Sequence, residues 1–160
     1  MKKIIATLAL IIACQGTFAQ NIDSLFDQFG KEYQAESISI SPFMMTLGKL
    51  FMSNDTPKVA KGIKSMRILD LEDCKTTVKE RFAEQVNNLH LEGYEPMIQV
   101  NEDGEKVRIF ALPDEESIKE LLFVCTGNDD CTLIQMKGKI KKEDISQLVN
   151  EQTSKKYGRK

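Results

Sequence analysis

The sequence predicts an α+β domain built on a mostly antiparallel sheet. Apolar residues recur with a helical period over residues 21–33 and again over residues 74–92. From Tyr94 onward the period changes to two, and four short runs are joined by turns of hairpin length. Strands grouped together after two or three helices are typical of a sheet whose apolar face is covered by helices.

The first helix is expected over residues 21–33, because its apolar residues share one face. These residues are Ile22, Leu25, Phe26, Phe29 and Tyr33. Asn21 is placed to cap the start of this helix, and Asp23 lies in its first turn. Residues 37–40 alternate serine and isoleucine, which indicates a short strand or a lead-in to the next element.

A second helix is predicted over residues 43–52, after a serine and a proline suited to the N-cap and the first helical position. This helix is apolar on nearly every side, so it either lies in the core or pairs with something outside the domain. The sequence favours the core. It also leaves a candidate partner surface, formed by Phe43, Met44, Met45 and Phe51.

The middle of the chain predicts one strand and the longest helix. The strand is expected over residues 62–71, and it joins the sheet at a position that the sequence does not define. The helix is expected over residues 74–92, with Gly93 as its C-cap. Its apolar face is formed by Val78, Phe82, Val86 and Leu89.

The C-terminal part of the chain predicts a four-stranded antiparallel meander. Its strands are expected over residues 97–100, 106–112, 118–125 and 131–137. Gly138 is expected to end the last strand, and a short helix that includes Ile145 follows. A single domain is therefore expected over residues 20–150, with a basic flexible tail over residues 151–160.

Residues 1–19 have the pattern of a secretory signal peptide. A basic start is followed by an apolar run over residues 4–13, and Thr17 and Ala19 place small residues before a cut at Gln20. We therefore expect export to the periplasm or beyond, with cleavage between Ala19 and Gln20. This would make the mature chain mildly acidic, because the removed segment contains two lysines and no acid.

A competing cut is present at Cys14, where residues 11–14 resemble a bacterial lipobox. Cys14 would then be acylated and would anchor the domain to a membrane as a lipoprotein. The leader would in that case be shorter than an ordinary signal peptide, so the sequence favours soluble export and keeps the lipid anchor as the alternative.

Charge and hydropathy argue against two classes of protein. The chain has 160 residues and a formal net charge of −2, which argues against a broadly basic nucleic-acid binder. The longest uncharged apolar run, over residues 4–13, is far shorter than the roughly 20 residues that span a bilayer. The sequence therefore predicts neither nucleic acid as a partner nor a transmembrane helix.

The cysteines suggest a disulfide. Cys125 and Cys131 flank a turn centred on Asn128, so a three- or five-residue loop would place them directly opposite each other. An oxidising compartment would allow this bridge to form, and Cys74 would remain as a free thiol. Two independent cysteines that face the core are the alternative.

The chain offers few groups for catalysis. The only histidine, His90, and the thiol of Cys74 are not part of any catalytic pattern that we recognise. The cysteines lack Cys-x-x-Cys spacing, which disfavours a metal site, and no cofactor is expected. The sequence therefore favours a non-enzymatic module that binds an envelope protein or a ligand. A small exported hydrolase or redox protein that uses His90 or Cys74 is the alternative.

The turns of the meander gather acidic residues. Alternate turns of a meander lie at the same end of the sheet, so two of them would form one acidic edge. The residues concerned are Glu102, Asp103, Glu105, Asp129 and Asp130. Such an edge could bind a cation or a basic partner, although turns favour Asp and Asn for backbone reasons alone.

Four short stretches carry a family resemblance. They are a phenylalanine-containing first helix, Ser-Ile-Ser-Pro-Phe-Met at residues 39–44, Ser-Met-Arg-Ile-Leu at residues 65–69, and Met-Lys-Gly-Lys-Ile at residues 136–140. In this order they resemble the exported Bacteroidetes family catalogued as domain of unknown function 4252, over about residues 22–150. The resemblance implies an exported or envelope-attached domain, and it assigns no catalytic residue.

Overall fold

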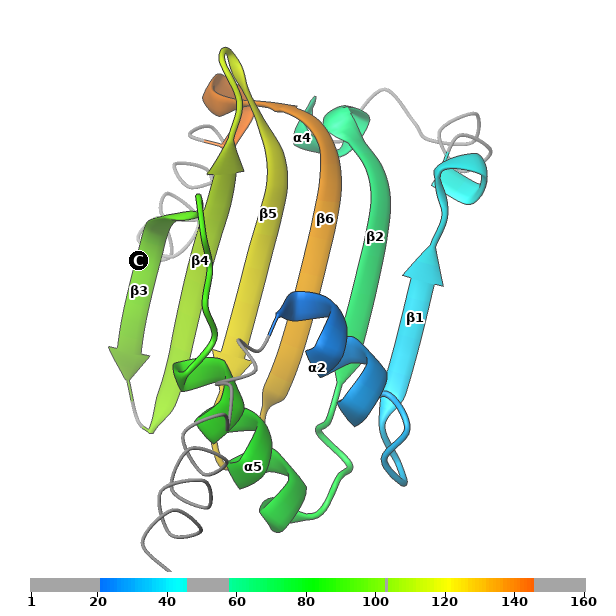
Figure 1. Ribbon diagram of the computed structural model, residues 1–160, viewed down its shortest axis with the longest axis vertical. Coiled ribbons are helices and arrows are strands. Elements are labelled where there is room, and N and C mark those ends of the chain that lie inside the picture. Colours follow the sequence, from blue (N-terminus) through cyan, green and yellow to red (C-terminus); the bar gives the residue numbers. More distant parts are fainter. Residues whose placement is uncertain (1–20, 46–57, 103, 146–160) are drawn as a thin grey trace, which may run out of the picture.

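The computed structural model describes residues 21–45, 58–102 and 104–145. These residues form a six-stranded antiparallel sheet with helices packed on it (Figure 1). The strands are β1 (Glu36–Ile40), β2 (Ile63–Asp70), β3 (Glu95–Glu102), β4 (Glu105–Pro113), β5 (Ser117–Thr126) and β6 (Cys131–Lys141). The helices with defined bounds are α2 (Ile22–Phe29), α4 (Lys58–Gly62) and α5 (Thr76–Asn87).

The sheet order is β1-β2-β6-β5-β4-β3, so the fold is α+β as predicted. The four C-terminal strands are neighbours in chain order, as a meander requires, and β2 pairs with β6. The layout differs from the prediction at one edge. Residues 36–40 form a full strand that pairs with β2, and the sheet therefore has one more strand than the five expected.

Helix α2 begins where the sequence predicts. The side chain of Asn21 accepts a hydrogen bond from the Ser24 backbone N–H at 2.8 Å, and the Asn21 N–H donates to the Ser24 hydroxyl at 3.3 Å. This reciprocal capping box satisfies two donors that a helix start leaves unpaired. The helix ends at Phe29, earlier than the predicted residue 33, and Tyr33 is exposed.

Helix α5 is also shorter than predicted. It begins at Thr76 and ends at Asn87, within the expected range of residues 74–92. Two asparagines at its end favour termination, because their side chains compete for backbone hydrogen bonds. Leu89 still packs against the core from the loop that follows. Gly93, the expected C-cap, lies in this loop with a φ of +79°.

Gly138 lies within a strand and does not end it. Strand β6 continues to Lys141, and it passes very close to the end of α4. A Cβ atom at position 138 would lie only 2.1 Å from the carbonyl oxygen of Gly62. The glycine therefore permits a close approach of two backbones, whereas the sequence suggested that it ends the strand.

The core lies on both faces of the sheet. On one face, α2 and α5 pack over β2, β6 and β5, and the rings of Phe29 and Phe82 meet edge to face at 5.2 Å. Leu121 belongs to a second cluster, on the opposite face from its neighbour Leu122. Helices α2 and α5 cover the end of the first face where β2 finishes, and they leave the end where β2 begins uncovered (Figure 1).

Candidate functional site

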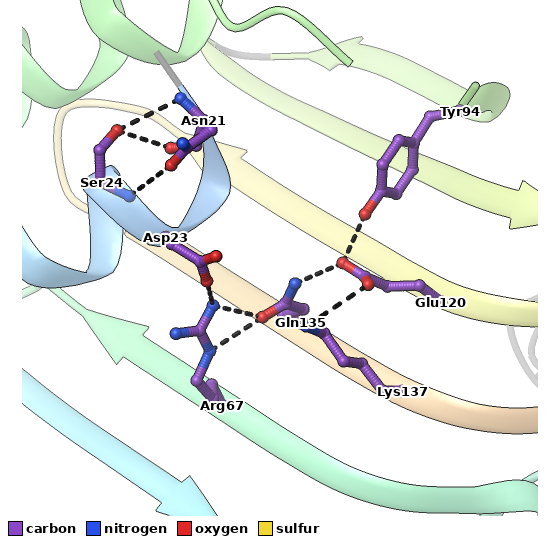
Figure 2. Close-up of polar contacts among 8 residues, drawn as sticks. All are labelled: Asn21, Asp23, Ser24, Arg67, Tyr94, Glu120, Gln135 and Lys137. Atoms are coloured by element: carbon purple, nitrogen blue, oxygen red, sulfur yellow. Dashed lines mark hydrogen bonds and ion pairs between the residues drawn. The ribbon is translucent and has the colours of Figure 1, made fainter. Parts of the chain in front are cut away.

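A chain of polar side chains crosses three neighbouring strands at the border of the helix-covered core (Figure 2). Arg67 in β2 lies opposite Gln135 in β6, and Glu120 in β5 lies opposite Lys137 in β6. Gln135 and Glu120 are only 4% and 7% exposed. Because buried polar groups need hydrogen-bond partners inside the protein, Gln135 and Glu120 must bond to neighbouring side chains.

Arg67 connects this chain to helix α2. Its Nε and Nη2 atoms donate to Gln135 Oε1 at 2.8 and 2.5 Å, and Nη2 also contacts Asp23 Oδ1 at 2.5 Å. Its guanidinium carbon lies 4.2 Å from the centre of the Phe26 ring. Asp23 and Phe26 are three residues apart on α2, so one arginine holds the helix by an ion pair and by a cation–π contact.

Glu120 lies at the other end of the row of polar side chains. Its Oε1 atom accepts hydrogen bonds from the Tyr94 hydroxyl at 2.5 Å and from the Gln135 side-chain amide. Its second oxygen, Oε2, lies 3.8 Å from Lys137 Nζ. Burial, together with the carboxylate of Glu120, raises the pKa of Tyr94 well above its ordinary value. The phenol therefore stays protonated and serves as a fixed donor.

A pocket of about 320 Å³ lies beside this chain, on the uncovered end of the same face. Three serines and three charged residues are among those that line it. These residues are Ser39, Ser41, Ser65, Asp23, Arg67 and Lys137. The volume is within the range of small-molecule sites in proteins.

Two cationic side chains, Arg67 and Lys137, line the pocket. Within the described residues, the hydrogen bonds of Arg67 use Nε and Nη2, which leaves Nη1 without one. Lys137 is half exposed, and its ammonium forms an ion pair with Glu120 Oε2 at 3.8 Å, a distance longer than a hydrogen bond. No hydrogen bond in the described part of the chain joins a pocket serine to a general base. The cationic side chains and serines of this wall are residue types that can donate hydrogen bonds to an anion.

The family assignment agrees with the sequence resemblance. The profile described as domain of unknown function (DUF4252) matches residues 29–148. The chain belongs to the DUF4252 family. The match includes all six strands of this DUF4252 domain and every residue of the polar chain except Asp23. No match is found among curated proteins or among solved structures. Among the residues that the structure describes, no helix is long and apolar enough to cross a membrane.

The expectation that Cys125 and Cys131 lie directly opposite each other is not met. The DUF4252 domain pairs Cys125 with Thr132 and Cys131 with Thr126, so the two cysteines do not face each other across the hairpin. Their side chains point to opposite faces of the sheet, because the pairing shifts by one residue. Cys125, Cys131 and Cys74 are all buried free thiols.

The acidic edge is partly as predicted. The turn between β3 and β4 lies beside the turn between β5 and β6, since a Cβ atom on Gly127 would lie 2.9 Å from Glu105 Cγ. Glu102, Asp129 and Asp130 are exposed at the same end, and Asp103 lies outside the described residues. Among the described residues, no three or more His, Cys, Asp or Glu side chains are grouped to hold a metal ion.

Lys79 places a positive charge at this acidic edge. Lys79 of α5 is 8% exposed, and its ammonium donates to the carbonyl oxygens of Asn128 and Asp129 at 3.4 and 2.8 Å. It also lines a second pocket of about 310 Å³, between α5 and the two turns. The lysine joins the helix to the β5–β6 turn and reduces the negative charge of the edge.

His90 and Cys74, the residues of the enzyme alternative, do not meet in a site. His90 is exposed, whereas Cys74 is buried and its thiol donates to the Tyr33 carbonyl oxygen at 3.5 Å. Burial raises the pKa of the Cys74 thiol, and the nearby carboxylate of Glu32 raises it to a smaller extent. Neither residue lines the two pockets described above. A protonated, buried thiol is a poor nucleophile.

The residues of the candidate partner surface differ in exposure. Residues 42–45 are helical, with Phe43 and Met44 exposed by 71% and 59% and Met45 buried. Phe51 lies outside the described residues, as do Cys14, Ala19 and Gln20. Exposure of two large apolar side chains makes this surface available to a partner, whereas Met45 belongs to the core.

The sequence did not single out the residues of the polar chain. A signal was present in β6, where apolar residues occupy both alternating sets of positions and Gln135 interrupts one of them. Such a strand is buried on both faces, so a polar residue within it must have an internal partner. Glu120 carries the same signal in β5. Which partners they find depends on strand order, which the sequence left undefined.

Proposed function

We propose that this chain is an exported, envelope-associated module that binds a small anionic ligand without catalysing a reaction. The observation that carries the proposal is the pocket beside Arg67, which is lined by two cationic residues and three serines. Guanidinium, ammonium and hydroxyl donors together are the usual partners of a carboxylate in proteins.

The polar chain supports binding because it holds the pocket wall in place. Arg67 is oriented by Gln135 and Asp23, and Gln135 is itself oriented by Glu120. A binding group fixed by such contacts loses little conformational freedom when a ligand arrives. The wall carries two cations and one carboxylate, and Lys137 also forms an ion pair with the carboxylate of Glu120 at 3.8 Å.

Small dicarboxylates are the probes that test this proposal. We expect succinate and glutamate to bind the mature chain in isothermal titration calorimetry and to raise its melting temperature. Uncharged succinamide should have no effect, because it lacks the anion that Lys137 and Arg67 recognise. Lys137→Met should weaken binding by roughly tenfold or more, which corresponds to losing one charge-assisted hydrogen bond.

Lys141→Met is the matched control, since Lys141 is an exposed lysine of the same strand and does not line the pocket. It should leave binding of the dicarboxylates unchanged. An equal loss of affinity in the two variants would indicate a general charge effect. Failure of every anion to bind the wild-type chain would remove the proposal.

The exported location rests on the leader pattern of residues 1–19. Mass spectrometry of the mature protein from its native host tests it. We expect an N-terminus at Gln20. An acylated Cys14 at the N-terminus would replace soluble export with the lipid-anchored alternative, and an intact Met1 would contradict export altogether.

A further inference from the structure

Strand β1 is an open edge of the sheet. In the order of the six strands it is terminal, and among the described strands it pairs only with β2 (Figure 1). Four of its five residues are exposed. An open edge presents unpaired backbone N–H and C=O groups, which can pair with another strand.

The two edge strands differ in how well they are protected against pairing with another chain. Strand β3, at the other edge, contains Pro96, a register shift between Pro96 and Ile98, and a glutamate at each end. Proline, bulges and charges are the devices by which natural proteins prevent edge-to-edge pairing. Strand β1 has neither a proline nor a register shift, and Glu36 is its only charged residue.

An apolar row ends at this open edge. One residue from each strand lies in the same register across the sheet, on the face opposite α2 and α5. The row consists of Ile38, Ile68, Ile134, Phe123, Ile109 and Ile98. Ile38 is 50% exposed, and no strand among the described residues lies on its outer side. Tyr33 and Phe43, on either side of β1 in the chain, are 82% and 71% exposed.

We propose that β1 is a dimerisation edge, at which two copies of this chain pair β1 with β1 in antiparallel orientation about Ile38. The strand is self-complementary in this register. Ile38 faces Ile38 of the second copy, Ser37 faces Ser39, and Glu36 faces Ile40, so no like charges are opposed. The apolar row then continues from one sheet into the other.

A second copy fits this edge because twofold pairing is the commonest way in which identical subunits assemble. The single charge of β1 lies at one end of the strand, so an antiparallel copy brings its own charge to the far end. A parallel copy in the same register would instead oppose the two glutamates. Ser39 of β1 also lines the anion pocket, whereas Ile38, at the centre of the pairing, lies on the opposite face of the sheet. The pairing goes beyond the proposed function.

Sedimentation equilibrium of the mature chain, over a roughly hundredfold range of concentration, tests the proposal. We expect a monomer–dimer equilibrium. Ile38→Lys should weaken the dimer by roughly tenfold or more, because two lysines would then face each other. Val100→Lys is the matched control, since Val100 lies on the opposite edge strand and is 45% exposed. It should leave the dimer unchanged.

A second, covalent test does not require the fold to tolerate a lysine at position 38. Ile38→Cys should form an intermolecular disulfide under mild oxidation, because cross-strand neighbours have the Cβ separation that a disulfide needs. Val100→Cys should not. A wild-type chain that stays monomeric, or a folded Ile38→Lys variant with undiminished dimer, would overturn the proposal. Loss of the dimer only in Val100→Lys would overturn it as well and would assign β3 as the interface.

Discussion

The guanidinium carbon of Arg67 lies 4.2 Å from the centre of the Phe26 ring, and the same guanidinium group bonds to Gln135 in the adjacent strand. One side chain therefore joins the apolar underside of α2 to the buried polar chain of the sheet. This relationship explains how a charged residue can lie at the border of the core, since its charge is paired and its flat surface is packed.

Removal of this connection should cost stability. Arg67→Met removes the ion-pair partner of Asp23 and leaves the side-chain oxygen of the buried Gln135 without its donor. We therefore expect a loss of about 1–3 kcal/mol in the free energy of unfolding. Urea denaturation, monitored by circular dichroism, measures this change.

Arg108 provides the comparison. It also lies near a phenylalanine, Phe110, at 5.9 Å, but its Nε and Nη2 atoms are buried without a hydrogen-bond partner in the described residues. Burial lowers the pKa of its guanidinium. Arg108→Met should therefore be neutral or stabilising, because it removes two buried N–H groups that have no partner among the described residues. Equal losses for both arginines would show that the hydrogen bonds of Arg67 contribute little.

Gly138→Ala should destabilise the fold by about 1–3 kcal/mol or more, a value typical of overpacked sites. The added methyl group would lie 2.1 Å from the Gly62 carbonyl oxygen, so the backbones of β6 and α4 must move apart. Lys139→Ala, at the next and exposed position, should change stability little. Thermal melts compare the two variants, and similar melting temperatures for both would contradict the close approach.

The mature chain should contain three free thiols. Cys74, Cys125 and Cys131 are buried and unpaired, and burial raises the pKa of each. We expect slow reaction with a thiol reagent in the native state and a count of three in the unfolded, non-reduced chain. A count of one would show that Cys125 and Cys131 are bridged despite the register of their strands.

Stability should fall at alkaline pH, partly because of Tyr94. Its pKa is raised in the folded state, so the unfolded chain loses the phenolic proton first as the pH rises above about 10. The stabilising contribution is complete below that pH and declines above it. Tyr94→Phe removes this group, and its urea midpoint should decrease less steeply between pH 9 and pH 11 than the wild-type midpoint. Parallel pH profiles would refute a linkage to Tyr94.

The sequence alone determined the elements whose signals are local. Asn21 capping α2, the hydrophobic face from Val78 to Val86, and the hairpins of the meander all follow from patterns within a few residues. Such patterns reflect backbone hydrogen bonding and side-chain spacing, which the neighbouring residues fix. The position of Cys125 relative to Cys131 was mistaken because a one-residue difference in turn length inverts the facing of every side chain.

Only the tertiary structure decided what the strands bring together. Arg67, Glu120 and Gln135 are up to 68 residues apart in sequence and become a bonded chain because β2 and β5 both pair with β6. The open edge at β1 has the same origin, since an edge exists only once the order of all strands is known. Long-range pairing depends on the packing of the whole sheet, and no local pattern of side chains encodes it.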